Sequence, residues 1–105
     1  MDSLRMTQAT ALILKSVVAG YAYGFDIMDV TGLPSGTIYP ALRRLEKAGY
    51  LRSRWEGQRV ADQEGRPRRK LYELTPLGAE AVPMADERLA AARALLDRPL
   101  GRERG

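Results

Sequence analysis

Basic side chains are concentrated in one third of the 105-residue chain, between residues 35 and 70. This segment holds ten of the 17 Lys and Arg residues but only four of the 13 Asp and Glu residues, so its balance of +6 exceeds the net charge of +4 of the whole chain. Such a density of cations pairs with rows of phosphate oxygens, which nucleic acids supply. The segment therefore predicts a phosphate-binding surface.

Catalytic chemistry has few candidate residues in this sequence. The chain contains no histidine and no cysteine. These residues supply the commonest general base, the thiolate nucleophile and most ligands of zinc and Fe–S clusters. Carboxylates such as Asp26, Asp29, Asp86 and Glu87 show no paired arrangement typical of catalysis. We therefore expect a protein that is not an enzyme and that holds neither a metal nor another cofactor.

Four helices are expected, and the third of them would position part of the basic segment. Apolar side chains recur at helical spacing in residues 8–19, 25–31, 36–48 and 76–96. Thr7, Ser35 and Thr75 precede three of these segments and are typical N-cap residues. In the third helix, Ile38, Leu42 and Leu45 form an inward stripe, which leaves the basic residues on the opposite side.

A β-hairpin is expected after the third helix. Alternating side chains predict strands over residues 50–56 and 69–74, and a polar loop over residues 57–67 joins them. The aromatic residues of this part of the chain and of the second helix are expected in the core or in hairpin packing: Phe25, Tyr50, Trp55 and Tyr72. The hairpin would place the basic run from Arg66 to Lys70 beside the basic third helix.

Three motifs resemble the PadR family of bacterial transcription regulators: YGFDIM (23–28), GTIYPALRRLEKAGYL (36–51) and RKLYELTPLGAEAV (69–82). The resemblance implies a mainly α fold with a small β-hairpin wing, that is, a winged helix-turn-helix plus a C-terminal dimerisation helix. One C-terminal helix resembles the short subfamily, whereas the wing loop is longer and richer in arginine than the family pattern. We expect a DNA-binding domain over residues 1–75, a dimerisation helix over 76–97 and a flexible tail over 98–105.

The third helix is the expected reader of double-stranded DNA, because an α-helix fits the major groove. Arginines of the wing are suited to the minor groove, where narrow segments concentrate negative potential. The DNA-binding candidates are Ser35, Thr37, Tyr39, Arg43, Arg44 and Lys47 of the helix, and Arg66, Arg68, Arg69 and Lys70 of the wing. The competing interpretation is a merely solvated basic helix face and a disordered polar loop.

Self-association into a homodimer is expected because a palindromic operator requires two-fold symmetry in the protein. The last helix carries an apolar stripe that can pack on the first helix and on a partner copy. The dimerisation candidates are Leu12, Leu77, Ala81, Met84, Leu89, Ala92, Leu95 and Leu96. In the alternative interpretation, this stripe packs wholly inside its own monomer.

The predicted function is that of a homodimeric repressor that binds a palindromic operator. The resemblance implies that a small hydrophobic or aromatic effector can relieve repression from a dimer-interface pocket, for which Trp55 is the candidate residue. The alternative is a winged-helix module that docks an acidic protein partner. The longest apolar run, residues 9–14, is too short to span a membrane, and the first residues do not resemble a signal peptide, so we expect a cytoplasmic protein without a membrane partner.

Overall fold

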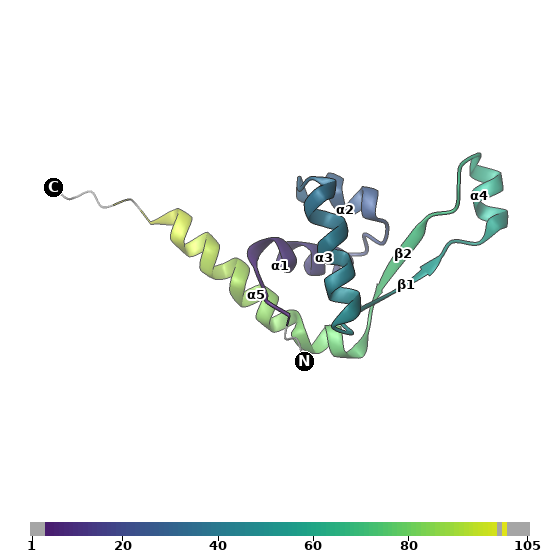
Figure 1. Ribbon diagram of the computed structural model, residues 1–105. Coiled ribbons are helices and arrows are strands. Elements are labelled where there is room, and N and C mark those ends of the chain that lie inside the picture. Colours follow the sequence, from purple (N-terminus) through teal and green to yellow (C-terminus); the bar gives the residue numbers. More distant parts are fainter. Residues whose placement is uncertain (1–3, 99, 101–105) are drawn as a thin grey trace.

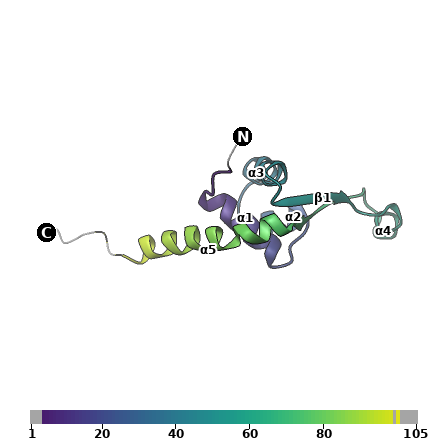
Figure 2. The same ribbon diagram turned by 90° about the horizontal axis from the view of Figure 1, so that it is seen from below.

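The computed structural model describes residues 4–98 and 100, which form a winged helix with five helices and a two-stranded antiparallel sheet (Figure 1). In chain order the elements are α1 (Gln8–Val18), α2 (Gly24–Thr31), α3 (Ser35–Lys47), β1 (Leu51–Trp55), α4 (Gln58–Glu64), β2 (Lys70–Leu74) and α5 (Pro76–Asp97). Helices α1 to α3 form a compact body, from which the hairpin projects to one side and α5 to the other (Figures 1 and 2). The predicted tail over 98–105 lies largely outside the described residues.

The core of the body is built around the inward stripe of α3. Ile38, Leu42 and Leu45 are each 0% exposed, which confirms the helical spacing predicted for this face. Full burial of a side chain of this size stabilises the fold by about 1.5–3 kcal/mol. The stripe belongs to one cluster with Ala11, Ile13, Leu14, Val17, Ile27, Ala41, Leu51, Tyr72, Ala81 and Ala85. All helices except α4, and both strands, therefore contribute to one core.

Two of the three predicted helix caps are confirmed. The Thr7 hydroxyl accepts the backbone N–H of Thr10 at 3.1 Å, and the Thr75 hydroxyl accepts that of Gly78 at 2.9 Å. The Thr75 hydroxyl also donates to the carbonyl oxygen of Gly49 at 2.5 Å. Since Gly49 lies just after α3, one side chain ties the end of this helix to the beginning of α5.

The loop predicted over residues 57–67 is wrong in one respect, because it contains the seven-residue helix α4. Gly57 is the N-cap residue, and Gly65 ends the helix in a left-handed conformation with φ +66°. Ala61, in the middle of the helix, is 0% exposed, and its carbonyl accepts the backbone N–H of Arg66. The tip of the wing is therefore a folded structure that turns the chain back into β2.

Helix α5 is only partly covered by its own chain. Its first half packs on α1 through the buried Ala81 and Ala85, and Lys15 forms a 2.8 Å salt bridge with Asp86. The second half projects away from the body, where Leu95 and Leu96 are 66% and 77% exposed (Figures 1 and 2). The radius of gyration is 16.5 Å, whereas a compact domain of this length has about 13 Å. No helix in the described part of the chain is long and apolar enough to cross a membrane.

Candidate nucleic-acid interface

The outer face of α3 presents polar and basic side chains to solvent. Tyr39, Arg43, Arg44 and Lys47 are exposed on the side opposite the core stripe. Arg44 and Lys47 lie in the last turn, where cations interact favourably with the helix dipole. Of the six candidates predicted on this helix, Thr37 alone is half-buried, and the other five are exposed.

Ser35 is exposed at the beginning of α3, but the prediction that it caps the helix is wrong. The N-cap residue is Pro34, whose backbone is extended, and its carbonyl accepts the N–H groups of Thr37 and Ile38. No side chain makes a capping hydrogen bond there. The Ser35 hydroxyl therefore makes no capping hydrogen bond, and it is free to bind a ligand from solvent.

The two faces of the hairpin differ in what they carry. Trp55 is opposite Lys70 in the antiparallel register, and Ser53 is opposite Tyr72. Ser53 donates a hydrogen bond to the Glu46 side chain of α3 at 2.5 Å, so this face of the hairpin is turned toward α3. Arg52 and Arg54 lie on the other face.

Glu73 occupies the hairpin face turned away from α3. Its two carboxylate oxygens accept hydrogen bonds from Arg52 and Arg54, each at 3.2 Å. These arginines lower the pKa of Glu73 below its usual value. Arg52 and Arg54 therefore already have a counter-charge, on the face that does not border α3.

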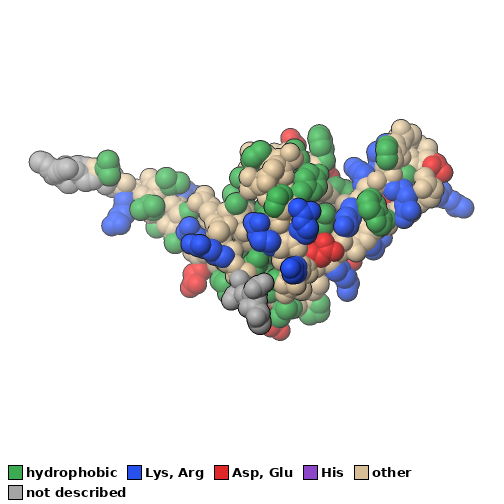
Figure 3. All heavy atoms as spheres, in the orientation of Figure 1, with side chains coloured by type: hydrophobic (Ala, Val, Ile, Leu, Met, Phe, Trp, Pro, Cys, Tyr) green, Lys and Arg blue, Asp and Glu red, His purple; other side chains and the backbone are tan. Residues whose placement is uncertain are grey.

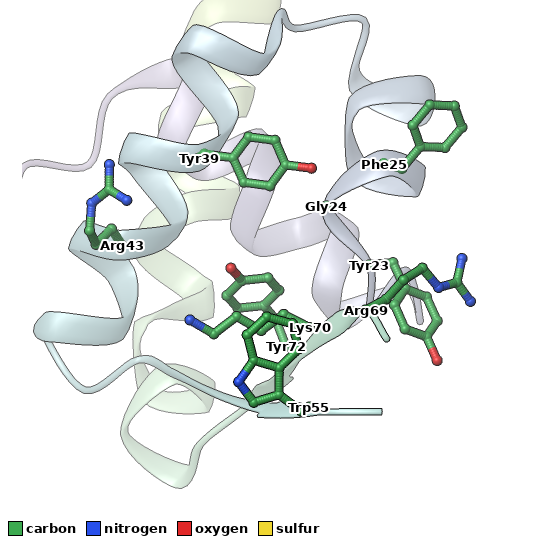
Figure 4. A pocket seen from close by; sticks show the side chains of 9 residues that line it. All are labelled: Tyr23, Gly24, Phe25, Tyr39, Arg43, Trp55, Arg69, Lys70 and Tyr72. Atoms are coloured by element: carbon green, nitrogen blue, oxygen red, sulfur yellow. The ribbon is translucent and has the colours of Figure 1, made fainter. Parts of the chain in front are cut away.

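A hollow of about 510 Å³ lies between the body and the hairpin (Figure 4). Its walls come from α2, α3 and the two strands, and from the residues just before α2 and β2: Tyr23, Gly24, Phe25, Tyr39, Arg43, Trp55, Arg69, Lys70 and Tyr72. Five of these nine residues are aromatic and three are cationic. The hollow brings the helix candidates Tyr39 and Arg43 together with the wing candidates Arg69 and Lys70.

The four aromatic residues expected in the core or in hairpin packing differ in how far they are exposed. Tyr72 is 7% exposed and belongs to the core, as predicted. Tyr50 packs against the core and is partly buried. For Phe25 the prediction is wrong, because its side chain is 69% exposed on α2. Trp55 is 55% exposed and lies outside the core, but it lies in the hairpin beside Lys70, its partner in the antiparallel register.

Glu56 is a site residue that the sequence did not reveal. It is 4% exposed and accepts two hydrogen bonds from the Arg66 guanidinium, at 2.5 Å and 3.0 Å. It also accepts the backbone N–H of Arg69 at 3.2 Å, and the Arg69 guanidinium lies 3.6 Å away. The Arg66 hydrogen bond is the main cause that lowers the pKa of Glu56 from 4.5 to about 2. We call Glu56, Arg66 and Arg69 the Glu56 cluster.

The four predicted cations of the wing fall into two pairs. Arg66 and Arg69 belong to the Glu56 cluster, and the Arg69 guanidinium also lies 3.7 Å from the centre of the Tyr23 ring. Arg68 and Lys70 are exposed, and their charged groups lie 6.0 Å and 5.8 Å from the centre of the Trp55 ring. Arg68 is further oriented by a 2.8 Å hydrogen bond from its Nε to the Glu56 carbonyl oxygen.

The exposed cations of α3 and of the wing appear on the same view of the molecule. Figure 3 shows blue side chains gathered over α3 and along the hairpin, in the orientation of Figure 1. A surface with this arrangement can hold a helix in one groove of a duplex and the wing over the adjacent backbone.

The predicted dimerisation residues differ in how much of them a partner can reach. Leu77, Met84, Leu95 and Leu96 are 49–77% exposed, and Leu12, Leu89 and Ala92 are partly exposed. Ala81 is 5% exposed within its own chain, so it has little surface left for a partner. The hollow that Trp55 borders contains no residue of α5. Trp55 is thus separated from the exposed apolar end of that helix.

Comparisons with known proteins agree with this architecture. The family model described as "Transcriptional regulator PadR-like family" matches residues 13–83. The crystal structure of smu.1704 from Streptococcus mutans UA159 is similar with a TM-score of 0.70 and 28% identity, over 91% of each chain. No curated protein sequence matches the chain at a significant level.

Two further solved structures share the fold at lower identity. A PadR family transcription regulator from Clostridium difficile R20291 has a TM-score of 0.68 and 22% identity, over 85% of this chain and 94% of that one. A transcriptional regulator from Clostridium thermocellum has a TM-score of 0.65 and 24% identity, over 88% and 89%. Because the family model covers more than half of the sequence, the chain belongs to the PadR-like family of transcriptional regulators.

Proposed function

We propose that this protein is a sequence-specific repressor that binds double-stranded DNA as a homodimer on a palindromic operator. The observation that carries this proposal is the position of exposed cations on both walls of one hollow, which Arg43 of α3 and the wing residue Lys70 both line. Two separate elements are thereby available to the same segment of duplex. The protein has no catalytic role in this proposal.

The two elements have different tasks in the proposed complex. Helix α3 lies in the major groove, where Tyr39 and Arg43 approach base edges and Arg44 and Lys47 contact phosphates. Ser35 and Thr37 are at the N-terminal end, which in this docking mode is closest to the bases. The wing contacts the neighbouring backbone or the minor groove through Arg68 and Lys70.

Dimerisation through α5 supplies the two-fold symmetry of the operator. Half of this helix extends beyond the body with Leu95 and Leu96 exposed, and a second copy of the same helix can cover this surface. In this arrangement residues 1–75 form the DNA-binding domain and residues 76–97 the dimerisation helix. The two copies of α3 must then be about 34 Å apart, one turn of DNA, or a multiple of it.

Repression follows from occupancy of a promoter, which blocks polymerase. A change in the angle between the two α5 helices alters the separation of the two α3 helices and weakens binding. A small hydrophobic or aromatic molecule bound beside Trp55 or between the α5 helices is the proposed effector. The ratio of the effector's affinities for the DNA-binding and the weakly binding arrangement of the dimer sets how far it can shift the equilibrium between them.

A selection from a random duplex library tests the proposal. The intact protein is expected to enrich sequences with two related half-sites, about one helical turn apart. Enrichment of no sequence would contradict specific DNA binding. A competition experiment tests the alternative function. If an acidic protein partner binds and duplex DNA fails to displace it, the winged helix is a protein-interaction module. Enrichment of single half-sites would contradict the dimer and leave DNA binding intact.

A further inference from the structure

The wing carries more cations than it offers to solvent. Arg66, Arg68, Arg69 and Lys70 are close together in the sequence, yet Arg66 and Arg69 share one carboxylate. The side chains of Arg66 and Arg69 are 27% and 37% exposed, and that of Glu56 is 4% exposed. Glu56 is therefore an acidic residue placed inside the basic surface, where it pairs with half of these four cations.

We propose that the Glu56 side chain determines which wing cations contact DNA, by pairing with Arg66 and Arg69 and leaving Arg68 and Lys70 available. This inference rests on the proposed function and deepens it. Glu56 is a positioning residue in this account, because it touches no DNA. The consequence is that only two of the four cations between residues 66 and 70, Arg68 and Lys70, are available to DNA.

The geometry of the pair explains why Arg66 is retained. Two guanidinium nitrogens of Arg66 bind two different oxygens of Glu56, the fork arrangement that gives arginine–carboxylate pairs their strength and fixed orientation. A third contact, from Arg66 Nη1 to the carbonyl of Pro67 at 3.4 Å, lies within the wing as well. Arg66 would have to lose all three contacts before it could reach a phosphate.

Arg69 is held by different contacts. Its guanidinium lies over the Tyr23 ring and beside Glu56, and its Nε is buried without a hydrogen-bond partner among the described residues. Its backbone also joins the hairpin, because the Arg69 carbonyl accepts the N–H of Glu56 at 2.8 Å. Arg69 thus connects the outer end of the hairpin strands to the residue before α2.

The number of phosphates that the wing contacts can be measured by the salt dependence of binding. Each neutralised phosphate steepens the slope of log K against log salt concentration by about 0.9. Glu56→Gln keeps the shape and the acceptor oxygen of the side chain but removes its charge, which frees Arg66 to reach a phosphate and leaves Arg69 held mainly by the Tyr23 ring. With one new contact in each wing of the dimer, the slope is expected to steepen by roughly 1.8.

Glu73→Gln is the matched control, because it also removes one carboxylate from the hairpin. Its partners Arg52 and Arg54 are already 68% and 62% exposed and lie on the face turned away from α3. The expected slope change is less than half of that for Glu56→Gln. The preference for operator over random duplex is also expected to fall in Glu56→Gln alone, because the released arginine contacts any sequence.

An unchanged or shallower slope in Glu56→Gln would overturn the inference, and so would an equal steepening in both variants. If circular dichroism shows that Glu56→Gln does not fold, the salt slopes of Arg66→Gln and Arg68→Gln test the inference instead. Arg66→Gln is expected to keep the wild-type slope, whereas Arg68→Gln makes it shallower by roughly 1.8 per dimer. An equal decrease of the salt slope in these two variants would contradict the inference. Failure of the proposed function is distinct, because the wild-type protein would then show no binding to duplex DNA.

Discussion

The ring of Tyr39 on α3 lies directly against the backbone of Gly24 at the beginning of α2. A Cβ atom on Gly24 would lie 2.5 Å from Cε1 of Tyr39 and 2.7 Å from its hydroxyl oxygen, closer than real atoms approach. Gly24 therefore leaves room for the Tyr39 ring, which a Cβ atom at this position would displace, and the φ angle of Gly24 is not left-handed. This contact fixes α3 relative to α2 at the edge of the hollow.

Gly24→Ala is expected to lower the free energy of unfolding by about 1 kcal/mol, the low end of the cost of overpacking, because the clash is with the end of the 41% exposed Tyr39 side chain, which can move. The ring of Tyr39 must move, so binding to the operator is expected to weaken as well. Denaturant unfolding measures the first effect. Gly36→Ala is the control, because an added Cβ there meets no atom within 4 Å. If Gly24→Ala were as stable as Gly36→Ala, the packing account would be contradicted.

Arg43→Ala and Arg68→Ala are expected to affect DNA binding differently. Loss of a base contact by Arg43 reduces the preference for the correct base at one operator position by about 1–3 kcal/mol. Loss of a phosphate contact by Arg68 weakens binding to all sequences and makes the salt slope shallower by about 1 for each wing. Titrations of operator and random duplex at several salt concentrations separate the two effects. Equal losses on every sequence for both variants would refute the assigned roles.

If α5 forms the proposed dimer interface, the double variant Leu95→Glu, Leu96→Glu is expected to be a folded monomer. Both side chains are more than half exposed in the single chain, so the stability of the monomer changes by less than about 0.5 kcal/mol for each residue. Sedimentation equilibrium gives the assembly state, and circular dichroism gives the fold. Val60→Glu is the control, since Val60 is 44% exposed on α4 at the far end of the molecule. An unchanged dimer in the Leu variant would exclude this end of α5 as the interface.

Stability is expected to fall in acid through Glu56. Its folded-state pKa of about 2 lies below the ordinary value of 4.5, because Arg66 binds the charged form. A lowered pKa stabilises the folded state above pH 4.5, and this contribution is lost as the pH falls from 4.5 toward 2. The unfolding free energy of the wild-type protein is therefore expected to decline in this window more steeply than that of Glu56→Gln. Glu73→Gln is the control and should keep the loss of unfolding free energy that Glu56 causes. Identical pH profiles of stability for the wild type and Glu56→Gln would refute the role of Glu56.

Most of the fold could be predicted from local patterns in the sequence. The stripe of Ile38, Leu42 and Leu45 and the caps Thr7 and Thr75 depend on residues a few positions apart, so their spacing is visible in the chain. Helix α4 was missed because its seven residues contain only Val60 and Ala61 as apolar side chains, too few to show a period. Its termini are nevertheless marked by Gly57 and Gly65.

The site was predicted less completely, because its contacts join residues far apart in the sequence. Ten candidate DNA-binding residues were chosen by charge and hydrogen-bonding capacity, which cannot distinguish a free arginine from one paired with a buried carboxylate. Glu56 could have been found from the hairpin register, since the pairing of Trp55 with Lys70 places residue 56 beside Arg69. The stacking of Arg69 on Tyr23 has no such local signal.

Trp55, the one tryptophan of the chain, provides the most direct test of the central claim that α3 and the wing together bind specific DNA. Its ring borders the hollow beside Lys70, so its fluorescence reports contact between the wing and a duplex. The intact protein is titrated with the region upstream of its own gene and with shuffled duplex, at several salt concentrations. The account predicts a change in Trp55 fluorescence, with affinity for the upstream region at least about 10³-fold higher than for shuffled DNA. Equal affinity for the two duplexes, or binding that leaves Trp55 fluorescence unchanged, would contradict it.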